Sequence, residues 1–299
     1  MSSILLIGDI VGYGNLGMSV MTPILSHLGY EIFRLPSSMV SNNFSYGKFA
    51  VLDTTDYMRQ CIDIWEEQVF SVDAVCTGYL VSKEQARIVS DYCRKLKARG
   101  TFIFVDPIMA DDGKLYNGAT EETVAYMRSV CQVADVIVPN VTEAKFLAGK
   151  YLDRDSLTSE EAEDLILTLH ALGDNSVIIS SMMMDGQTCT MLFDKSVGKT
   201  KVLPYRQVAA QFSGTGDVFS SVTIGQYIKG NTLEDSVLKA MNFVSHVIEA
   251  NLNFLRQDNG IPIERHFNEL SREFALVFDD LADGLSMVGH YFCEIGTVR

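Results

Sequence analysis

Short apolar runs rich in β-branched residues alternate along most of the chain with longer segments whose apolar positions recur every three or four residues. The short runs have the length of buried strands, and the longer segments have the period of amphipathic helices. This alternation predicts an α/β fold in three layers, α/β/α, with a mostly parallel central sheet. We expect residues 1–299 to form a single domain that binds its ligands at the carboxyl ends of the strands.

Local start and stop signals bound the expected elements. A strand at residues 4–7 leads into a helix at about residues 16–28, and a second strand at residues 31–35 ends at Pro36, because proline has no N–H for a ladder hydrogen bond. Further strands are expected at residues 74–77, 102–105, 136–138 and 177–179. Capping-box patterns predict two helix starts, at Ser82-x-x-Gln85 and Thr158-x-x-Glu161.

Two stretches interrupt the alternation. Residues 37–48 are polar, aromatic and glycine-containing, which predicts a loop or small lid hairpin that covers a pocket. Residues 187–193 and 200–203 predict an antiparallel pair of strands at one sheet edge. After Asp217 the chain is expected to be helical, with its longest helix at residues 233–253.

Composition narrows the class of protein. Hydrophobic residues make up 47% of the chain, charged residues 21%, and no apolar run is longer than a strand, so we expect no membrane span. The net charge of −14 argues against a nucleic-acid partner. Six scattered cysteines without a C-x-x-C pair predict reduced thiols in a cytoplasmic protein. An acidic protein that binds a polyphosphate needs local N–H donors and a divalent cation.

One glycine-rich stretch, Ser213-Gly214-Thr215-Gly216-Asp217, precedes a helical segment. Exposed N–H groups at a helix N-terminus favour an anion, whereas a carboxylate at that point competes with the anion unless it handles a proton. The combination suggests chemistry on a phosphate. An ordinary helix cap explains the five residues equally well when they are taken alone.

A second glycine pattern, residues 12–17, matches the dinucleotide motif G-x-G-x-x-G between a strand and a helix. A dinucleotide site needs an acidic residue at the end of the second strand, but Glu31 stands at its start. The same glycines lack the lysine of a phosphate-binding P-loop, because Met18 occupies that position. We therefore favour a tight turn beside a pocket over an NAD-dependent oxidoreductase.

Three acidic residues follow or open elements of the expected sheet. Asp106 follows the strand at residues 102–105, Glu143 lies after the strand at residues 136–138, and Asp217 opens a helix. Parallel strands would bring these carboxylates to one edge, although each has an ordinary role in a turn or a helix start. Mg²⁺ takes oxygen ligands, retains water and bridges phosphates, so two such acids would suit it.

Sequence motifs at these positions resemble the signatures of the ribokinase-like superfamily of small-molecule kinases. The motifs are Gly214-Thr215-Gly216-Asp217, Asn140-x-x-Glu143 and Asp106-Pro107-Ile108-Met109. Within the superfamily, the chain resembles the pyridoxal kinase branch at residues 41–48, 78–82 and 111–116, in the same order. The resemblance runs from the first strand to about residue 255.

This resemblance implies transfer of a phosphoryl group from ATP to the hydroxymethyl group of pyridoxal, pyridoxamine or pyridoxine. Asp217 would take the alcohol proton, and the N–H groups of residues 214–217 would form the anion hole. The metal would be Mg²⁺, organised by Asp106 and Glu143, with a monovalent cation as a further candidate. The resemblance also implies a homodimer and places further nucleotide-binding residues at Asn140, Ser180 and Ser213.

On the substrate side, the resemblance implies contacts from Asp9, Phe44, Ser45 and Tyr79. Asp9 stands where the branch has a serine that faces the pyridine nitrogen; its carboxylate would favour a protonated ring, or would simply tie down the glycine turn. Phe44 replaces a threonine, which exchanges a hydroxyl contact for stacking or occlusion. Ser180 replaces a phosphate-binding lysine, which leaves more counter-charge to Mg²⁺ and the anion hole.

Other functions stay open on the sequence alone. One alternative is a related kinase that acts on a hydroxymethylpyrimidine or a sugar. The resemblance implies a cysteine at position 217 for the pyrimidine enzyme, where this chain has Asp217. It implies an early pair of glycines for a sugar kinase, and this chain lacks that motif. The loss of the serine and lysine equivalents also leaves room for a catalytically silent ligand sensor. The intact Asp106, Glu143 and Asp217 favour the kinase.

Overall fold

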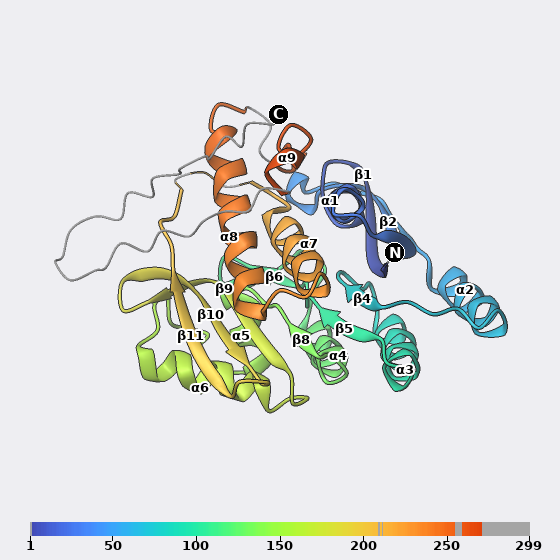
Figure 1. Cartoon of the computed structure of the whole chain (residues 1–299), viewed down its shortest axis with the longest axis horizontal. Coiled ribbons are helices and arrows are strands. Elements are labelled where there is room, and N and C mark those ends of the chain that lie inside the picture. The colour runs from blue at the N-terminus through green and yellow to red at the C-terminus, as the bar shows by residue number, and fades with distance from the viewer. Residues whose placement is uncertain (1, 209, 211, 255–258, 271–299) are drawn as a thin grey trace, which may run out of the picture.

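A nine-stranded sheet forms the centre of the molecule in a computed structural model that describes residues 2–208, 210, 212–254 and 259–270 (Figure 1). The strands are parallel from β9 to β2, and antiparallel strands close both edges. From one edge to the other the sheet contains β11 (Lys199–Pro204), β10 (Gln187–Asp194), β9 (Ser176–Met184), β8 (Val136–Ile137), β5 (Phe102–Val105), β4 (Ala74–Thr77), β1 (Ser3–Tyr13), β2 (Glu31–Asn42) and β3 (Val51–Asp53). The mostly parallel sheet and its edge hairpins confirm the sequence prediction.

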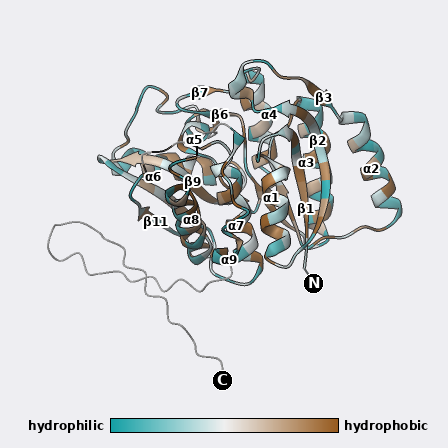
Figure 2. Ribbon diagram, turned by 90° about the horizontal axis from the view of Figure 1, so that it is seen from above, coloured by the Kyte–Doolittle hydropathy of each residue, from teal (hydrophilic) through white to brown (hydrophobic). Residues whose placement is uncertain are grey.

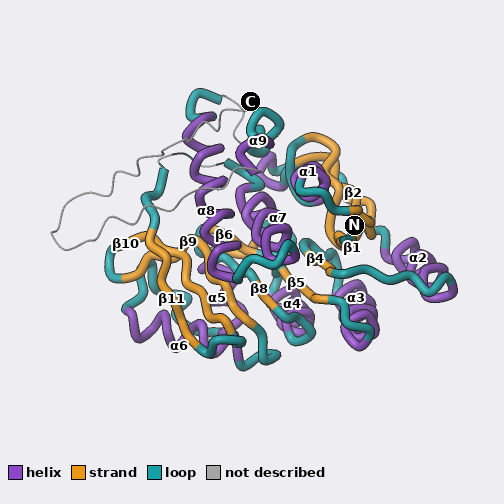
Figure 3. The backbone as a smooth tube through the Cα atoms, viewed as in Figure 1, coloured by secondary structure: helices purple, strands orange, loops and turns teal. Residues whose placement is uncertain are grey.

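Helices cover both faces of this sheet, which gives the expected α/β/α layers (Figures 1 and 3). One layer contains α2 (Thr55–Glu67), α3 (Lys83–Ala98), α4 (Glu121–Cys131), α5 (Val141–Ala148) and α6 (Ser159–His170). The other contains α1 (Met18–His27), α7 (Thr215–Ile228), α8 (Leu233–Ala250) and the short α9 (Phe267–Leu270). A separate two-stranded hairpin is made of β6 (Ala110–Asp111) and β7 (Lys114–Leu115), and one 3-10 turn, η1, spans Phe44–Tyr46.

The core divides into two clusters, one on each face of the sheet. On β1, Leu5 and Ile7 belong to the cluster under α2–α6, and Ile4 and Leu6 belong to the cluster under α1, α7 and α8. All four side chains are buried, because the strand is covered on both faces, and this explains its unbroken apolar run. Figure 2 shows hydrophobic residues both on the strands and on the helices that cover them.

The second strand does not end at Pro36, so that prediction is wrong. β2 continues to Asn42, and its register with β1 shifts after the pair Gly8–Pro36, with Asp9 opposite Ser38. Ser37 is therefore an extra residue in β2, and the missing N–H of Pro36 falls at this bulge, where the ladder is already interrupted. The expected hairpin forms from the end of β2 and from β3, with η1 in the connection.

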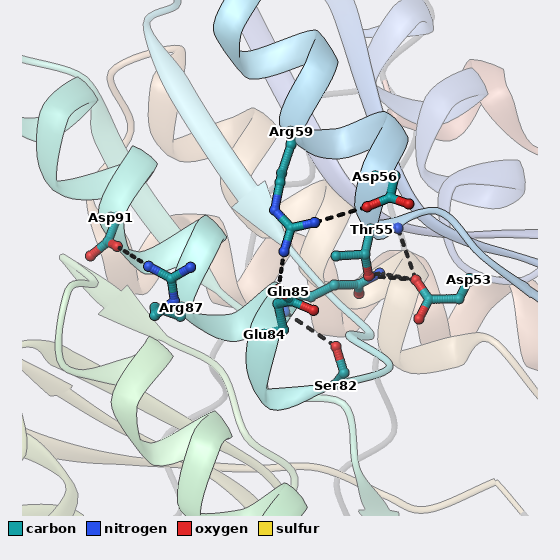
Figure 4. A network of polar contacts seen from close by, with 9 residues as sticks. All are labelled: Asp53, Thr55, Asp56, Arg59, Ser82, Glu84, Gln85, Arg87 and Asp91. Carbon is teal, nitrogen blue, oxygen red and sulfur yellow. Dashed lines mark hydrogen bonds and ion pairs between the residues drawn. The ribbon is translucent and has the colours of Figure 1, made fainter.

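A buried glutamine anchors this hairpin to α3 (Figure 4). Gln85 Nε2 donates to the main-chain oxygen of Ser37 at 2.7 Å and to Asp53 Oδ1 at 3.1 Å. Asp53 Oδ1 also accepts from the backbone N–H of Thr55 at 2.8 Å, at the start of α2. Ser82 accepts from the Gln85 N–H, but the Gln85 side chain accepts from Val81 instead of Ser82, so only half of the expected capping box is present.

Other sequence predictions have mixed outcomes. The capping box at Thr158 and Glu161 opens α6, and the predicted pair at the sheet edge is β10 and β11. The strand expected at residues 177–179 is longer than predicted: β9 includes the buried Met182. α8 ends at Ala250, three residues before the expected end.

The part of the chain that the structure describes contains five free cysteines, Cys61, Cys76, Cys93, Cys131 and Cys189. Cys293 lies outside the described residues. No helix in the described part of the chain is long and apolar enough to cross a membrane.

Candidate active site

A cavity of about 2070 Å³ opens at the carboxyl ends of the parallel strands. Its walls come from the ends of β1, β5 and β9, from the start of α7, and from the η1 segment between β2 and β3. Every residue that the sequence assigned to catalysis or binding lines this cavity: Asp9, Phe44, Ser45, Tyr79, Asp106, Asn140, Glu143, Ser180, Ser213, Gly214, Thr215, Gly216 and Asp217.

The glycine-rich stretch at residues 213–217 forms the N-terminus of α7, as expected. Gly214 caps the helix in the left-handed conformation, with φ of +81°, and a Cβ at this position would lie 2.7 Å from the carbonyl oxygen of Asn15. Only glycine meets both conditions without strain. Residues 214–217 line the cavity, so an anion in the cavity can approach the N–H groups of the first helical turn.

Asp217 has one satisfied and one unsatisfied carboxylate oxygen. Its Oδ2 accepts a hydrogen bond from the backbone N–H of Gly17 at 3.0 Å, whereas its buried Oδ1 has no partner. Burial raises the pKa of Asp217 to about 6, against the lowering effect of the Gly17 N–H. A buried, partnerless carboxylate oxygen with such a pKa is able to accept a proton near neutral pH.

Asp9 lies on the other side of Gly17. A Cβ at Gly17 would lie 2.6 Å from Asp9 Oδ1, so the turn packs directly against the carboxylate. Burial, followed by the charge of Asp217, raises the pKa of Asp9 to about 7. Asp9 therefore both supports the turn and lines the cavity, and the sequence treated these two roles as alternatives.

The glycine pattern at residues 12–17 is a tight strand-to-helix turn beside the pocket, as the sequence favoured. β1 continues through Tyr13, and Gly17, with φ of +54°, caps α1. The contribution of this turn to the site is the Gly17 N–H that Asp217 accepts. The two residues are 200 positions apart, and no local pattern signals their contact.

Asp106 follows β5 and is 7% exposed. Its Oδ2 accepts from the hydroxyl of Ser220 on α7 at 2.6 Å. Burial raises the pKa of Asp106 to about 7; the Ser220 hydroxyl lowers it, and the charge of Asp217 raises it. Sequence reasoning assigned Ser220 no role in the site, because a serine inside a helix gives no signal of a partner 114 positions away.

Glu143 is also buried, and its carboxylate is occupied by backbone donors. Oε1 accepts from Met109 N at 3.0 Å, and Oε2 accepts from Asn140 N at 2.9 Å. Asn140 completes a capping box by accepting from the Glu143 N–H at 2.9 Å and donates to Ala110 O at 2.8 Å. Burial and the charge of Asp106 raise the pKa of Glu143 well above its usual range. The pair therefore fixes the loop after Asp106.

These acids fit a divalent cation that arrives with a phosphate. Burial raises the pKa of Asp106 and Asp217, and Asp217 Oδ1 has no hydrogen-bond partner, so a cation would replace solvation that these two carboxylates lack. Within the described ranges, no group of three or more His, Cys, Asp or Glu side chains is arranged to hold a metal ion alone. Mg²⁺ at Asp106 would thus complete its shell with water and phosphate oxygens.

Aromatic residues form the wall near Asp9. The rings of Phe44 and Tyr79 are 5.4 Å apart, and Phe44 packs edge-on against Phe49 at 4.6 Å. Burial raises the pKa of Tyr79 to about 12, so its hydroxyl stays protonated. A flat ring would be bounded here by apolar surfaces, with a carboxyl group at one side.

Ser213 and Ser180, both predicted to bind the nucleotide, make contacts of different kinds. Ser213 Oγ accepts from Asn43 Nδ2 at 2.8 Å, which joins the η1 segment to the start of α7. Ser180 lies in β9, where its N–H donates to Pro139 O at 3.1 Å and its strand bridges to Asn140. Ser180 lines the cavity, and its short side chain supplies no positive charge there.

An α/β/α fold with a glycine-rich helix start and strand-end acids at one sheet edge defines the ribokinase-like class of small-molecule kinases. The sequence profile of the phosphomethylpyrimidine kinase family matches residues 34–261 of this chain. The chain therefore belongs to this family, and it is a small-molecule kinase.

The chain is similar to pyridoxal kinases in sequence and to kinases of this class in structure. The pyridoxal kinase of Bos taurus is 28% identical over 267 residues, which cover 83% of this chain and 84% of the relative. A putative phosphomethylpyrimidine kinase from Bacteroides thetaiotaomicron, crystallised with pyridoxal, superposes with a TM-score of 0.87 at 30% identity and covers 92% of this chain and 97% of its own. Pyridoxal kinase from Lactobacillus plantarum gives 0.82 at 25% identity, with coverage of 90% and 96%.

Proposed function

We propose that this protein is a pyridoxal kinase that transfers the γ-phosphoryl group of ATP to the 5'-hydroxymethyl group of pyridoxal, pyridoxamine or pyridoxine. The observation that carries the proposal is Asp217 Oδ1, a buried carboxylate oxygen without a partner at the glycine-rich start of α7. Phosphoryl transfer to an alcohol needs a proton acceptor next to an anion cradle, and these two parts lie within one helical turn.

In the proposed reaction, Asp217 accepts the proton of the substrate hydroxyl. The alcohol oxygen forms a bond to the γ-phosphorus, the bond between that phosphorus and the β–γ bridging oxygen breaks, and ADP leaves. The N–H groups of residues 214–217 face the charge that develops on the transferred group, because the first turn of a helix has no internal partners for them.

Bound Mg²⁺ would neutralise phosphate charge during the transfer. We assign its organisation to Asp106, which Ser220 holds, and to Glu143, which orders the loop after Asp106. Asn140, Ser180 and Ser213 are proposed for the nucleotide side because they line the cavity between this loop and α7. A monovalent cation is a further candidate next to this acidic surface.

Asp9, Phe44, Ser45 and Tyr79 are proposed to hold the substrate ring. Support comes from the aromatic contact of Phe44 with Tyr79 and from the carboxyl group of Asp9 beside Gly17. A protonated ring nitrogen would pair with the Asp9 carboxylate, and this contact would offset the burial that raises the pKa of Asp9.

One kinase domain would thus contain the whole site. The five free cysteines in the described residues support a reducing compartment, which for this kinase we propose is the cytoplasm. A homodimer is proposed from the resemblance to pyridoxal kinases. Light scattering at micromolar concentration tests this assembly, because a dimer would have twice the 33.2 kDa mass of the monomer.

The second candidate is a kinase of hydroxymethylpyrimidine, which the name of the matching family favours. A panel assay separates the two: the protein is incubated with MgATP and pyridoxal, pyridoxamine, pyridoxine, hydroxymethylpyrimidine or simple sugars, and ADP release is measured. Turnover confined to the three pyridine alcohols supports the proposal. Turnover of the pyrimidine alone contradicts it, and tight binding without any turnover indicates a ligand sensor.

A further inference from the structure

Residues 259–264, in the segment that follows α8, contact the glycine turn. The backbone N–H of Asn15 donates to the carbonyl oxygen of Asn259 at 2.7 Å, and Asn15 Nδ2 donates to Glu264 Oε1 at 2.6 Å. These partners are about 250 positions apart in the chain. Two hydrogen bonds from Asn15 thus hold the turn against this segment.

The carbonyl group of Asn15 is enclosed by two glycines. A Cβ at Gly260 would lie 2.4 Å from Asn15 O, and a Cβ at Gly214 would lie 2.7 Å from the same atom. Gly260 belongs to the segment after α8, and Gly214 caps α7 at the proposed anion hole. Asn15 therefore lies in van der Waals contact with both, and any shift of one segment displaces the turn against the other.

The turn ends two residues beyond Asn15 at Gly17, whose N–H donates a hydrogen bond to Asp217. Gly17 N donates to Asp217 Oδ2 at 3.0 Å, so the position of this turn determines the orientation of the Asp217 carboxylate. The same outer segment also reaches the lid, because the Tyr46 hydroxyl of η1 donates to Asn259 Oδ1. Asn259 thus contacts the lid with its side chain and the turn with its main chain.

We propose that Asn15, Asn259 and Gly260 form a brace that positions Asp217 through the Gly17 N–H and joins this position to the lid through Tyr46. The inference rests on the proposed kinase function, in which Asp217 is the base. Asn15 and Asn259 are positioning residues, because they act on the reaction only through Gly17 and the lid.

Gly260→Ala tests the brace. Its methyl group would collide with Asn15 O and displace the turn, so kcat falls about tenfold or more, as expected for a misplaced catalytic group. The acidic limb of the kcat/KM profile also moves to higher pH, because the Gly17 N–H that lowers the pKa of Asp217 is weakened. The matched control is Gly29→Ala, since Gly29 has a similar φ of +93° with nothing within 4 Å. Equal kinetics and an unmoved limb in the two variants would overturn the proposal.

Hydrogen exchange at Gly17 gives a readout that needs no substrate. If the brace holds the turn, the Gly17 amide exchanges faster in Gly260→Ala than in the wild type or in Gly29→Ala. Unchanged exchange in Gly260→Ala would contradict the proposed brace, whatever the activity of the variant. Absence of turnover in the wild type would instead reject the kinase function, and the exchange result would still decide on the brace.

A double-mutant cycle tests the connection to the lid. Asn259→Ala and Tyr46→Phe each remove one partner of the same hydrogen bond, so each raises KM for the alcohol substrate severalfold while the acidic limb stays in place. The double variant then loses less than the product of the two single effects. Fully independent effects would show that Asn259 does not act on the lid through Tyr46.

Discussion

Asp9 and Asp217 approach the same glycine from two sides. Gly17 N donates to Asp217 Oδ2 at 3.0 Å, and the space that a Gly17 side chain would need is occupied by Asp9 Oδ1. The charge of Asp217 adds to burial in raising the pKa of Asp9. Two acids in this arrangement disfavour simultaneous ionisation, so the site is built to receive a proton or a cation.

The stability of the ligand-free protein should depend on the protonation of Asp9. Its pKa is about 7 in the folded protein and near 3.8 when unfolded, so its favourable contribution is complete below pH 3.8 and is lost as pH rises through 7. The loss is at most about 4 kcal/mol, at ~1.4 kcal/mol per pKa unit. Asp9→Asn removes this dependence, so we expect the variant to gain stability relative to the wild type between pH 5 and pH 8.

Urea unfolding of both proteins at the two pH values measures this gain. The slope of unfolding free energy against urea should be the same for both, because the substitution leaves the surface exposed on unfolding unchanged. A stability difference that does not vary with pH would mean that Asp9 is ionised throughout this range in the folded protein.

Ser220→Ala should weaken the response to Mg²⁺. The Ser220 hydroxyl donates to Asp106 Oδ2, and its loss raises the pKa of Asp106 further, because this hydrogen bond favours the carboxylate. We expect the Mg²⁺ concentration for half-maximal activity to rise about tenfold or more, as for other residues that orient a metal-organising group. A magnesium titration of the initial rate measures the change.

Ser221→Ala is the matched control for this titration. Ser221 is the next residue of α7, and its hydroxyl donates to the main-chain oxygen of Asp217 within the helix. This substitution removes the same atom without touching Asp106, so its Mg²⁺ requirement should equal that of the wild type. If both variants need the same raised concentration, Asp106 does not depend on Ser220.

Ser180→Lys should restore a positive charge that the cavity wall lacks at this strand end. Ser180 lies in β9 next to Asn140 and lines the cavity, so a lysine there would reach toward bound phosphates. We expect KM for ATP to fall severalfold at low salt and less at high salt. Ser180→Met supplies similar bulk without charge; the same fall in KM for this variant would rule out an electrostatic cause.

The ends of strands were the sequence signal for the candidate site. Asp106 and Glu143 follow apolar runs that are recognisably buried strands, and parallel pairing brings the ends of such strands to one edge. The glycine-rich start of α7 was recognisable in the sequence because a left-handed position such as that of Gly214 strongly favours glycine. These features depend on local pattern together with one general rule of topology.

Contacts between distant segments were beyond prediction. The hydrogen bond from Gly17 to Asp217 and the one from Ser220 to Asp106 join residues that are 200 and 114 positions apart. Their donors are a backbone N–H in a turn and a serine hydroxyl in a helix, and neither shows its partner in the sequence. The continuation of β2 past Pro36 was missed because a bulge tolerates the missing N–H only where the neighbouring strand changes register. Such facts follow from packing and not from the residues of one segment.

Direct identification of the phosphorylated product with wild-type protein and with Asp217→Asn tests the central claim. With MgATP and pyridoxal, we expect the wild type to form a phosphate ester at the 5'-hydroxymethyl group, detected by ³¹P NMR and mass spectrometry. Asp217→Asn should fold and bind ATP normally and lose on the order of 10²–10⁴ in turnover, as expected when a general base is removed. Product formation at the wild-type rate by Asp217→Asn would contradict the account.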